Sequence, residues 1–319
     1  FFACNAPIKG LYELGVEIEE NSELDLLVSY KEHANDPRIA DVCADMAAEM
    51  GEGHYYPDLL ARMAQFELTL LDWAENHKGS KKYVAFADKC WPAFPSQFGF
   101  EPCYVNSRLA SRGIPVACEV DIYGALSEYI GMCASGDTVT LLDINNSVPK
   151  YIYDEDITGK FNYKLTDTFM GFHCGNTPSC KMCSDRAVKY QLIQHRLLEP
   201  AGSDPDFTRG TLEGDIAPSN ITFYRLQCDS EGQLRAYIAQ GEILPVATRS
   251  FGGIAIFAIP EMGRFYRHVL IQKRYPHHGA VAFGHYGKTL FEVFKFLGIA
   301  DIAYNQPKSL PYPTENPFA

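Results

Sequence analysis

The sequence predicts an α/β fold in two parts. A parallel-sheet α/β domain is expected over residues 1–134, and a β-rich, antiparallel, barrel-like domain with two late helices over residues 135–319. Helical and strand patterns alternate in the first part, which favours a parallel sheet. Strand-like segments separated by turns fill the second part. A chain of 319 residues is long enough for two domains with a large core.

In the first part, apolar residues recur at helical or strand spacing. The longest helix is expected where Leu59, Met63, Phe66 and Leu70 form one apolar stripe, which is typical of a core face. We expect helices over residues 6–15, 22–36, 36–51, 55–79, 103–113 and 124–135, and strands over residues 16–20, 83–87, 114–119 and 138–142.

In the second part, short segments of alternating apolar and polar residues are separated by turn residues. The stretch DSEGQ at residues 229–233 predicts a hairpin turn between two of them. We expect strands over residues 137–144, 163–174, 217–228, 233–244 and 251–259, and helices over residues 261–275 and 288–299.

The composition of the chain limits the kinds of partner that the protein is expected to bind. A net charge of -12 argues against nucleic acid or an anionic membrane as the main partner. No apolar run approaches the roughly 20 residues that a membrane helix needs. The ten cysteines are scattered, and many lie inside apolar runs, so we expect reduced thiols and a cytoplasmic protein.

Two carboxylates stand where predicted strands end. Glu119 follows the apolar run IPVAC, and Asp143 ends the strand TVTLL, with a helix between them. Ligand groups gather at the carboxyl ends of strands in open α/β sheets. Two carboxylates brought together there can bind a hard divalent cation or exchange a proton. Much later, the stretch YPHHGAVAFGHYGKTL adds His277, His278 and His285.

Several blocks of this sequence resemble the L-fucose isomerase family, in particular its microbial fucose/arabinose isomerase-like branch. They are CEVDIYGAL, FHCGN, GDIAPSNITFYRL and HHGAVAFGHYGKTLFEVFKFLGI, and they occur in the family's order, with the family's spacing of Glu119 and Asp143. The resemblance implies a Rossmann- or flavodoxin-like first domain that is incomplete at its start. It also implies that the N-terminal domain of the family is missing from this chain.

The resemblance implies an enzyme that interconverts an aldose and its ketose through an enediolate, with L-fucose or D-arabinose as the type of substrate. Glu119, Asp143 and His278 would hold Mn²⁺ or another divalent cation, a role that suits mixed carboxylate and imidazole ligands. Glu119 and Asp143 would also move the proton between neighbouring sugar carbons.

Three further residues are candidates for contacts with the sugar. They are His277, His173 and Trp91, and for each of them a purely structural role is the competing interpretation. The family resemblance further implies a small sugar as the partner and a homo-oligomer, either a trimer or a hexamer.

Two other classes of function stay open. One is a catalytically silent, sugar-binding relative. The other is a zinc-stabilised structural protein built on Cys174, Cys180 and Cys183 in the stretch FHCGNTPSCKMC. That stretch has a single CxxC pair, whereas structural zinc sites usually show two pairs.

Overall fold

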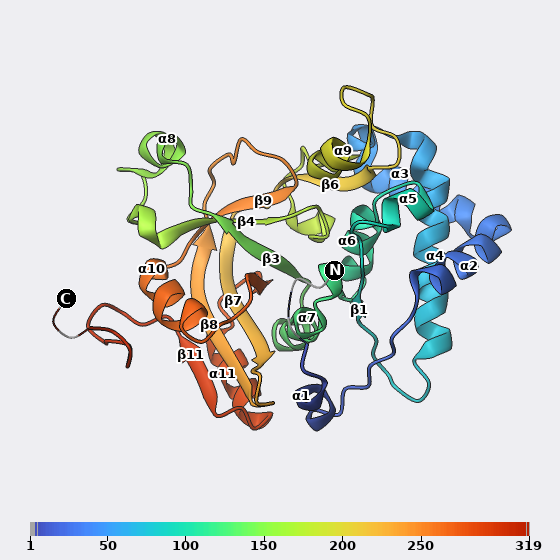
Figure 1. The fold of residues 1–319 in the computed structure, drawn as a ribbon. Coiled ribbons are helices and arrows are strands. Elements are labelled where there is room, and N and C mark those ends of the chain that lie inside the picture. Colours follow the sequence, from blue (N-terminus) through green and yellow to red (C-terminus); the bar gives the residue numbers. More distant parts are fainter. Residues whose placement is uncertain (1–3, 5, 317, 319) are drawn as a thin grey trace.

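The computed structural model describes residues 4, 6–316 and 318. It is a mixed α/β fold in which helices dominate the first part of the chain and a large sheet dominates the second (Figure 1). The first-part helices are α1 (Ile8–Glu13), α2 (Glu23–Glu32), α3 (Ile39–Met50), α4 (Leu60–His77), α5 (Phe94–Phe98), α6 (Cys103–Ser111) and α7 (Ile122–Ser135).

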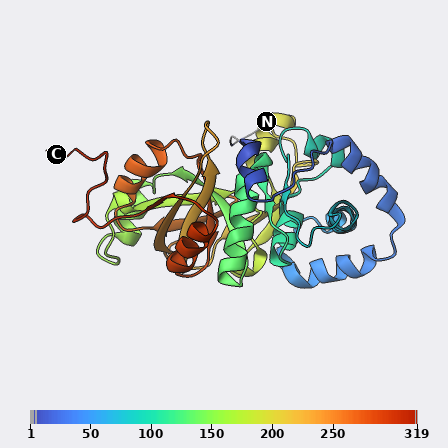
Figure 2. The same ribbon diagram turned by 90° about the horizontal axis from the view of Figure 1, so that it is seen from below.

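The long helix α4 is the centre of the helical part. Met63, Phe66 and Leu70 are buried in a core shared with α2, α3 and α6, as the apolar stripe predicts. Helices α2 and α3 pack against α4, which is seen nearly end-on in Figure 2. Arg108 of α6 ties this group together, because its guanidinium bonds carboxylates of α3 and of α4.

The large sheet has nine strands in the order β11-β8-β7-β10-β3-β4-β9-β6-β5. Their bounds are β3 (Val139–Asn146), β4 (Thr168–His173), β5 (Ala187–Tyr190), β6 (Arg209–Asp215), β7 (Ser219–Cys228), β8 (Leu234–Ile243), β9 (Gly253–Ala258), β10 (His278–Ala282) and β11 (Asp301–Tyr304). Strand β8 also pairs with β9, which closes β8, β7, β10, β3, β4 and β9 into a ring of six strands. Every pair in this ring is antiparallel.

Helices cover the sheet on both sides. Helix α7 packs on β3, β7 and β10, and α11 (Gly287–Phe296) lies beside α7 and β8. Helix α10 (Met262–Phe265) continues into a π-helical turn, Tyr266–Ile271, and buries Phe265 and Val269 in a second core with Tyr237. Two further α-helices lie in this part of the chain, α8 (Lys150–Ile152), which continues into the π-helical turn Tyr153–Ile157, and α9 (Leu192–Leu198).

The predicted fold class is confirmed in part. The hairpin turn is confirmed, because residues 229–233 connect the antiparallel strands β7 and β8, with Gly232 at φ 87°. The parallel sheet expected in the first part is reduced to β1 (Phe86–Ala87) paired with β2 (Val116–Ala117). The boundary between residues 134 and 135 stays a prediction.

The strand predicted over residues 16–20 is wrong. Val16 and Ile18 are partly buried against the core that contains α7, so the alternating pattern correctly marks an apolar side. No β-ladder forms there, because the Val16 N–H bonds the Leu11 carbonyl at the end of α1 instead of a neighbouring strand. Within the part of the chain that the structure describes, no helix is long and apolar enough to cross a membrane.

Candidate metal and active site

Strand register brings Asp143 and His278 together. The two residues lie opposite each other on the antiparallel strands β3 and β10, so their side chains share one face of the sheet. Asp143 Oδ1 lies 2.9 Å from His278 Nε2. The sequence predicts that Asp143 ends its strand, and this is wrong. Strand β3 runs on to Asn146, with a bulge after Ile144. Bulges of this kind are common beside active sites.

Glu119 reaches the same place from the end of β2. It has a left-handed backbone conformation, with φ 60° and ψ 31°, and Val120 follows it at φ 59°. Such conformations cost about 1–3 kcal/mol each in non-glycine residues and cluster at functional sites. Glu119 Oε2 lies 4.0 Å from His278 Nε2. That separation is short enough for both atoms to bind one cation, since two bonds of about 2.1 Å span at most roughly 4.2 Å.

Asp143 and His278 turn two potential metal-ligand atoms toward the same space. Both Asp143 Oδ1 and His278 Nε2 are buried, and neither has a hydrogen-bond partner in the described chain, although they are 2.9 Å apart. Buried polar atoms without a partner are rare. A carboxylate oxygen and an imidazole nitrogen that converge on one space suit a divalent cation between them.

Two further histidines surround this centre. Among the described residues, ligand atoms of Glu119, His277 and His278 lie within 4.8 Å of one another, and so do those of Asp143, His173 and His278. The two groups share His278. His277 Nε2 is 3.6 Å from Asp143 Oδ1, and its side chain is 49% exposed, so it borders the open side of the site.

His173 presents a hydrogen-bond donor to the site. Its ring is 2% exposed, and Nδ1 accepts the backbone N–H of Cys174 at 3.1 Å. Burial lowers the pKa of His173 to about 4, so the ring is neutral. Since Nδ1 is the acceptor, Nε2 carries the hydrogen, and this atom has no partner in the described chain.

The two carboxylates differ in their electrostatic surroundings. Burial alone would raise the pKa of Asp143, but His278, His173 and His277 outweigh it, so the pKa of Asp143 is lowered. Burial raises the pKa of Glu119, and the negative charges of Asp143 and Asp121 add to this effect. Without a cation, the site therefore holds one carboxyl that ionises readily and one that ionises less readily.

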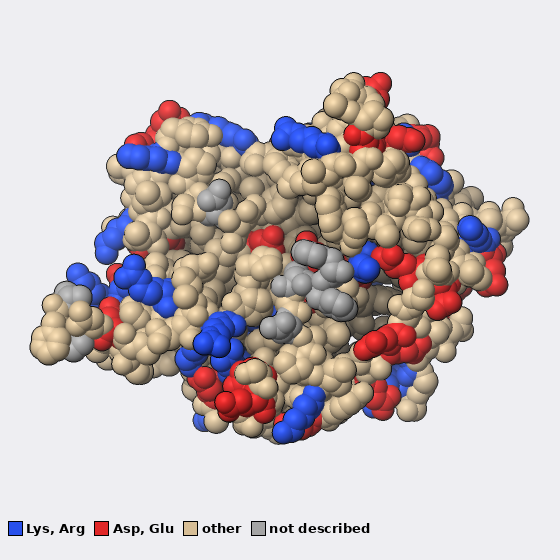
Figure 3. Space-filling view, in the orientation of Figure 1, with Lys and Arg blue, Asp and Glu red and all other residues tan. Residues whose placement is uncertain are grey.

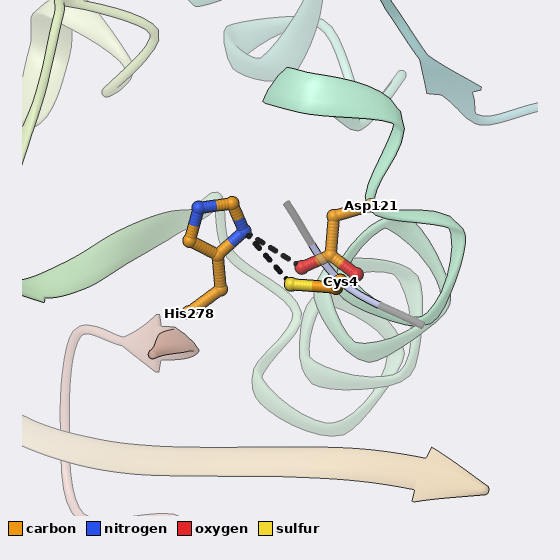
Figure 4. A group of neighbouring side chains, drawn as sticks. All are labelled: Cys4, Asp121 and His278. Atoms are coloured by element: carbon orange, nitrogen blue, oxygen red, sulfur yellow. Dashed lines mark hydrogen bonds and ion pairs between the residues drawn. The ribbon is translucent and has the colours of Figure 1, made fainter. Parts of the chain in front are cut away.

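Sequence reasoning missed Asp121. Its side chain accepts the Gly124 N–H and so begins α7, and Asp before a helical run is a recognisable N-cap signal. Its second contact could not be read from sequence, because Oδ2 lies 2.9 Å from Nδ1 of His278, 157 residues away. Figure 4 shows Asp121 and Cys4 beside this ring nitrogen. The other ring nitrogen, Nε2, is left to face Asp143.

Trp91 lies in the loop between β1 and α5, is partly exposed, and precedes Pro92 through a cis peptide bond. The neighbouring Cys90 Sγ is 3.1 Å from Cys118 Sγ, so this loop packs beside the residue that precedes Glu119. His285 bonds the carbonyl oxygen of Gly241 at 3.1 Å.

The cysteines of the zinc hypothesis do not assemble. In the described residues, no group of three potential ligands within 4.8 Å includes Cys174, Cys180 or Cys183. Cys180 is exposed, 3.9 Å from the Thr138 hydroxyl, whereas Cys174 accepts a hydrogen bond from Gln191. All ten cysteines are free.

Part of the chain is similar in sequence to a known family of sugar isomerases. Residues 171–304 match the model of the L-fucose isomerase C-terminal domain. The chain is 26% identical over 185 residues to a sulfoquinovose isomerase of Clostridium sp. (strain MSTE9), covering 56% of this chain and 34% of that protein. It is 22% identical over 249 residues to the sulfoquinovose isomerase of Priestia aryabhattai, covering 77% and 49%, and 24% identical over 239 residues to that of Alkalicoccus urumqiensis, covering 75% and 47%.

These matches relate the chain to ketol isomerases of sugars. More particularly, residues 171–304 match the L-fucose isomerase C-terminal domain family, and most of the chain is distantly similar to sulfoquinovose isomerases. The predicted family resemblance is thus confirmed. The chain spans less than half the length of the relatives that it matches.

Proposed function

We propose that this protein interconverts a free aldose and its ketose, with a divalent cation such as Mn²⁺ held by Glu119, Asp143 and His278. One observation carries the proposal. Asp143 Oδ1 and His278 Nε2 are buried, lie 2.9 Å apart and have no other hydrogen-bond partner in the described chain, and a second carboxylate, that of Glu119, lies 4.0 Å from His278 Nε2. The match of residues 171–304 to an isomerase family supports the same conclusion.

The cation, when bound, would supply positive charge that stabilises the enediolate form of the sugar. Glu119 and Asp143 would transfer the proton between the two neighbouring carbons, one carboxylate accepting it and the other returning it. Both carboxylates are partly buried, at 27% and 23% exposed, so they remain accessible to a sugar that enters from the open side.

His173, His277 and Trp91 are the proposed sugar contacts. The Nε2–H of His173 is a buried donor without a partner in the described chain, which suits a sugar hydroxyl or carbonyl oxygen. His277 lies at the exposed border of the site. Trp91 belongs to the loop that packs beside Cys118, next to Glu119, and its ring would provide an apolar surface for the sugar.

Two kinds of sugar are candidates. The resemblance seen in the sequence favours L-fucose or D-arabinose, whereas the relatives named above are sulfoquinovose isomerases. We propose to test all three aldoses, with and without Mn²⁺. Ketose formation that depends on Mn²⁺ supports the proposal and identifies the preferred substrate.

The decisive variants are Glu119→Gln and Asp143→Asn, which keep the side-chain size but remove the charge. Each should reduce isomerisation at least about 100-fold, as expected for loss of an acid–base group, while the circular dichroism spectrum stays unchanged. Glu242→Gln is the matched control, because this glutamate lies on β8, accepts a hydrogen bond from the Tyr163 hydroxyl, and should leave the rate unchanged. Normal turnover by either site variant contradicts the mechanism.

The runner-up is a catalytically silent, sugar-binding relative. It predicts that the chain binds Mn²⁺ and an aldose but forms no ketose with any sugar of the panel. The zinc-stabilised structural protein has no assembled ligand set among the described residues.

We also propose a homo-oligomer, a trimer or a hexamer, in which a neighbouring subunit covers the exposed side of His277.

A cytoplasmic location is proposed because all ten cysteines are free. On the face in Figure 3, basic side chains are scattered among acidic and uncharged ones, so the proposed partner is a small sugar and not a nucleic acid.

A further inference from the structure

A fully buried ion pair lies directly behind His278. Arg225 of β7 is 0% exposed and Asp121 is 1% exposed. The guanidinium holds the carboxylate with two parallel bonds, Nη1 to Oδ2 and Nη2 to Oδ1, each 2.7 Å long. This fork-to-fork geometry fixes orientation more strictly than a single contact does.

The Asp121 carboxylate has no freedom left to rotate. Besides the two bonds from Arg225, Oδ1 accepts the Gly124 N–H at 2.9 Å. Oδ2 therefore has one direction in which to accept the Nδ1–H of His278, at 2.9 Å. Because Nδ1 carries the hydrogen in this bond, Nε2 is the ring nitrogen that faces Asp143 and can bind a cation.

Arg225 also contacts His278 directly. Its Nη1 donates to the backbone carbonyl of His278 at 3.2 Å. Gln227 Oε1 in turn accepts from Nε and Nη2 of Arg225, at 3.0 and 2.8 Å. The guanidinium thus holds the backbone of His278 and, through Asp121, the orientation of its ring.

Stability alone is a poor explanation for this pair. Burying two charges is costly, and replacing a buried ion pair by apolar side chains of similar size is often neutral or stabilising. A residue that orients a ligating histidine, by contrast, typically changes metal affinity or activity 10–100-fold when it is removed.

We infer that Arg225 is a positioning residue that acts through Asp121 to hold His278 with Nε2 toward the cation-binding space. The inference rests on the proposed function only in taking His278 as a ligand. Neither Arg225 nor Asp121 would touch the cation or the sugar.

The same contacts explain why Cys4, Asp121 and His278 are not a second cation site, although their ligand atoms lie within 4.8 Å of one another. Both oxygens of Asp121 are already bonded by the positive guanidinium of Arg225. Cys4 Sγ, 3.5 Å from Nδ1, packs beside this arrangement (Figure 4).

The test is Arg225→Lys in the full chain, since lysine keeps the charge but lacks the fork. Mn²⁺ affinity measured by calorimetry should fall about 10–100-fold. In the metal-free protein, at a pH high enough to keep the ring neutral, nitrogen NMR of labelled histidine should show His278 protonated only at Nδ1 in the wild type and as a mixture of tautomers in the variant. The sugar panel should show a lower kcat with little change in KM.

Arg108→Lys is the matched control. Arg108 is also a buried arginine, 4% exposed, and bonds Glu49 and Glu67 among the helices of the first part. Both variants should unfold at a lower temperature, but only Arg225→Lys should lose Mn²⁺ affinity and the single tautomer. Equal Mn²⁺ affinity and an unchanged tautomer in folded Arg225→Lys would overturn the inference.

If Arg225→Lys does not fold, the double variant Arg225→Gln with Asp121→Asn replaces the ion pair by two neutral amides and is tested in the same way. Failure of the inference and failure of the proposed function are distinguishable. A wild type that binds no Mn²⁺ contradicts the proposed function, whereas the tautomer of His278 still tests the role of Arg225.

Discussion

Two buried carboxyl groups of this protein, those of Asp121 and Glu128, differ in whether they are ionised. Burial alone would raise the pKa of Asp121, but Arg225 outweighs it, and the pKa is held well below its usual range. Glu128 of α7 is 2% exposed and its Oε2 has no partner in the described chain. Burial raises the pKa of Glu128 well above its usual value, with a further contribution from Asp121, so the folded state keeps this carboxyl protonated.

Glu128 should make stability depend on pH in a defined direction. The unfolded chain loses this proton near pH 4.3, whereas the folded chain keeps it, so stability falls as pH rises, by about 1.4 kcal/mol for each unit over which the two states differ. Glu128→Gln removes this loss. In urea unfolding of the metal-free protein, the variant should therefore gain more stability at pH 8 than at pH 4.5.

Glu199 provides a control of opposite sign. Burial would raise its pKa, but hydrogen bonds from Thr208, Asp206 and His195 outweigh it and lower the pKa. This carboxylate therefore stabilises the fold above about pH 4.3, and the contribution is lost as pH falls through the lowered pKa. Glu199→Gln should lose more stability at pH 8 than at pH 3. For either substitution, an equal effect at the two pH values compared would show that the carboxyl does not titrate as described.

At the scale of elements, the approach of α7 to the sheet positions the site. Helix α7 begins at the cap residue Asp121 and packs on β7, β10 and β3. Gly131 lies where the helix comes closest, because a Cβ built there would be 1.6 Å from the hydroxyl oxygen of Tyr224. That hydroxyl donates to the Ser127 carbonyl, 2.9 Å away on the same helix.

Gly131→Ala should therefore reverse the usual effect of this substitution. In an open helix, alanine stabilises relative to glycine by about 0.5–1 kcal/mol. Here the added methyl group must displace Tyr224, and overpacking typically costs about 1–3 kcal/mol. Urea unfolding measures the sign. In a Tyr224→Ala background the cost should shrink, and an unchanged cost there would locate the strain elsewhere.

At the scale of the whole molecule, the cysteines divide by burial. Cys133 and Cys180 are exposed, and all ten cysteines are free. The fully buried set is Cys4, Cys90, Cys103, Cys118 and Cys228. Burial keeps these thiols from a reagent in solution and disfavours the charged thiolate, which is the reacting form.

Ellman's reagent should therefore label the native protein in distinct phases. Cys133 and Cys180 should react first, and the buried five only on unfolding. Replacing both exposed cysteines by serine should remove the fast phase, and a reductant should leave the unfolding temperature unchanged. Fast labelling of any of the five buried cysteines in the native protein would contradict this burial pattern.

The sequence by itself determined local structure wherever a single pattern of apolar or turn residues specifies that structure. The stripe of α4, the hairpin between β7 and β8 and the position of Glu119 after β2 follow from spacing over a few residues. The segment at Val16 and Ile18 shows the limit, because alternation reports which side is buried but not whether a neighbouring strand supplies hydrogen bonds.

Tertiary structure decided everything that depends on partners far apart in the chain. The register of β3 against β10 places Asp143 opposite His278, and the left-handed backbone of Glu119 turns its side chain toward them. The pair of Arg225 and Asp121, 104 residues apart, leaves no periodic signal in the sequence. The physical reason is that local patterns depend on neighbouring residues, whereas these contacts depend on how the closed ring of strands brings distant segments together.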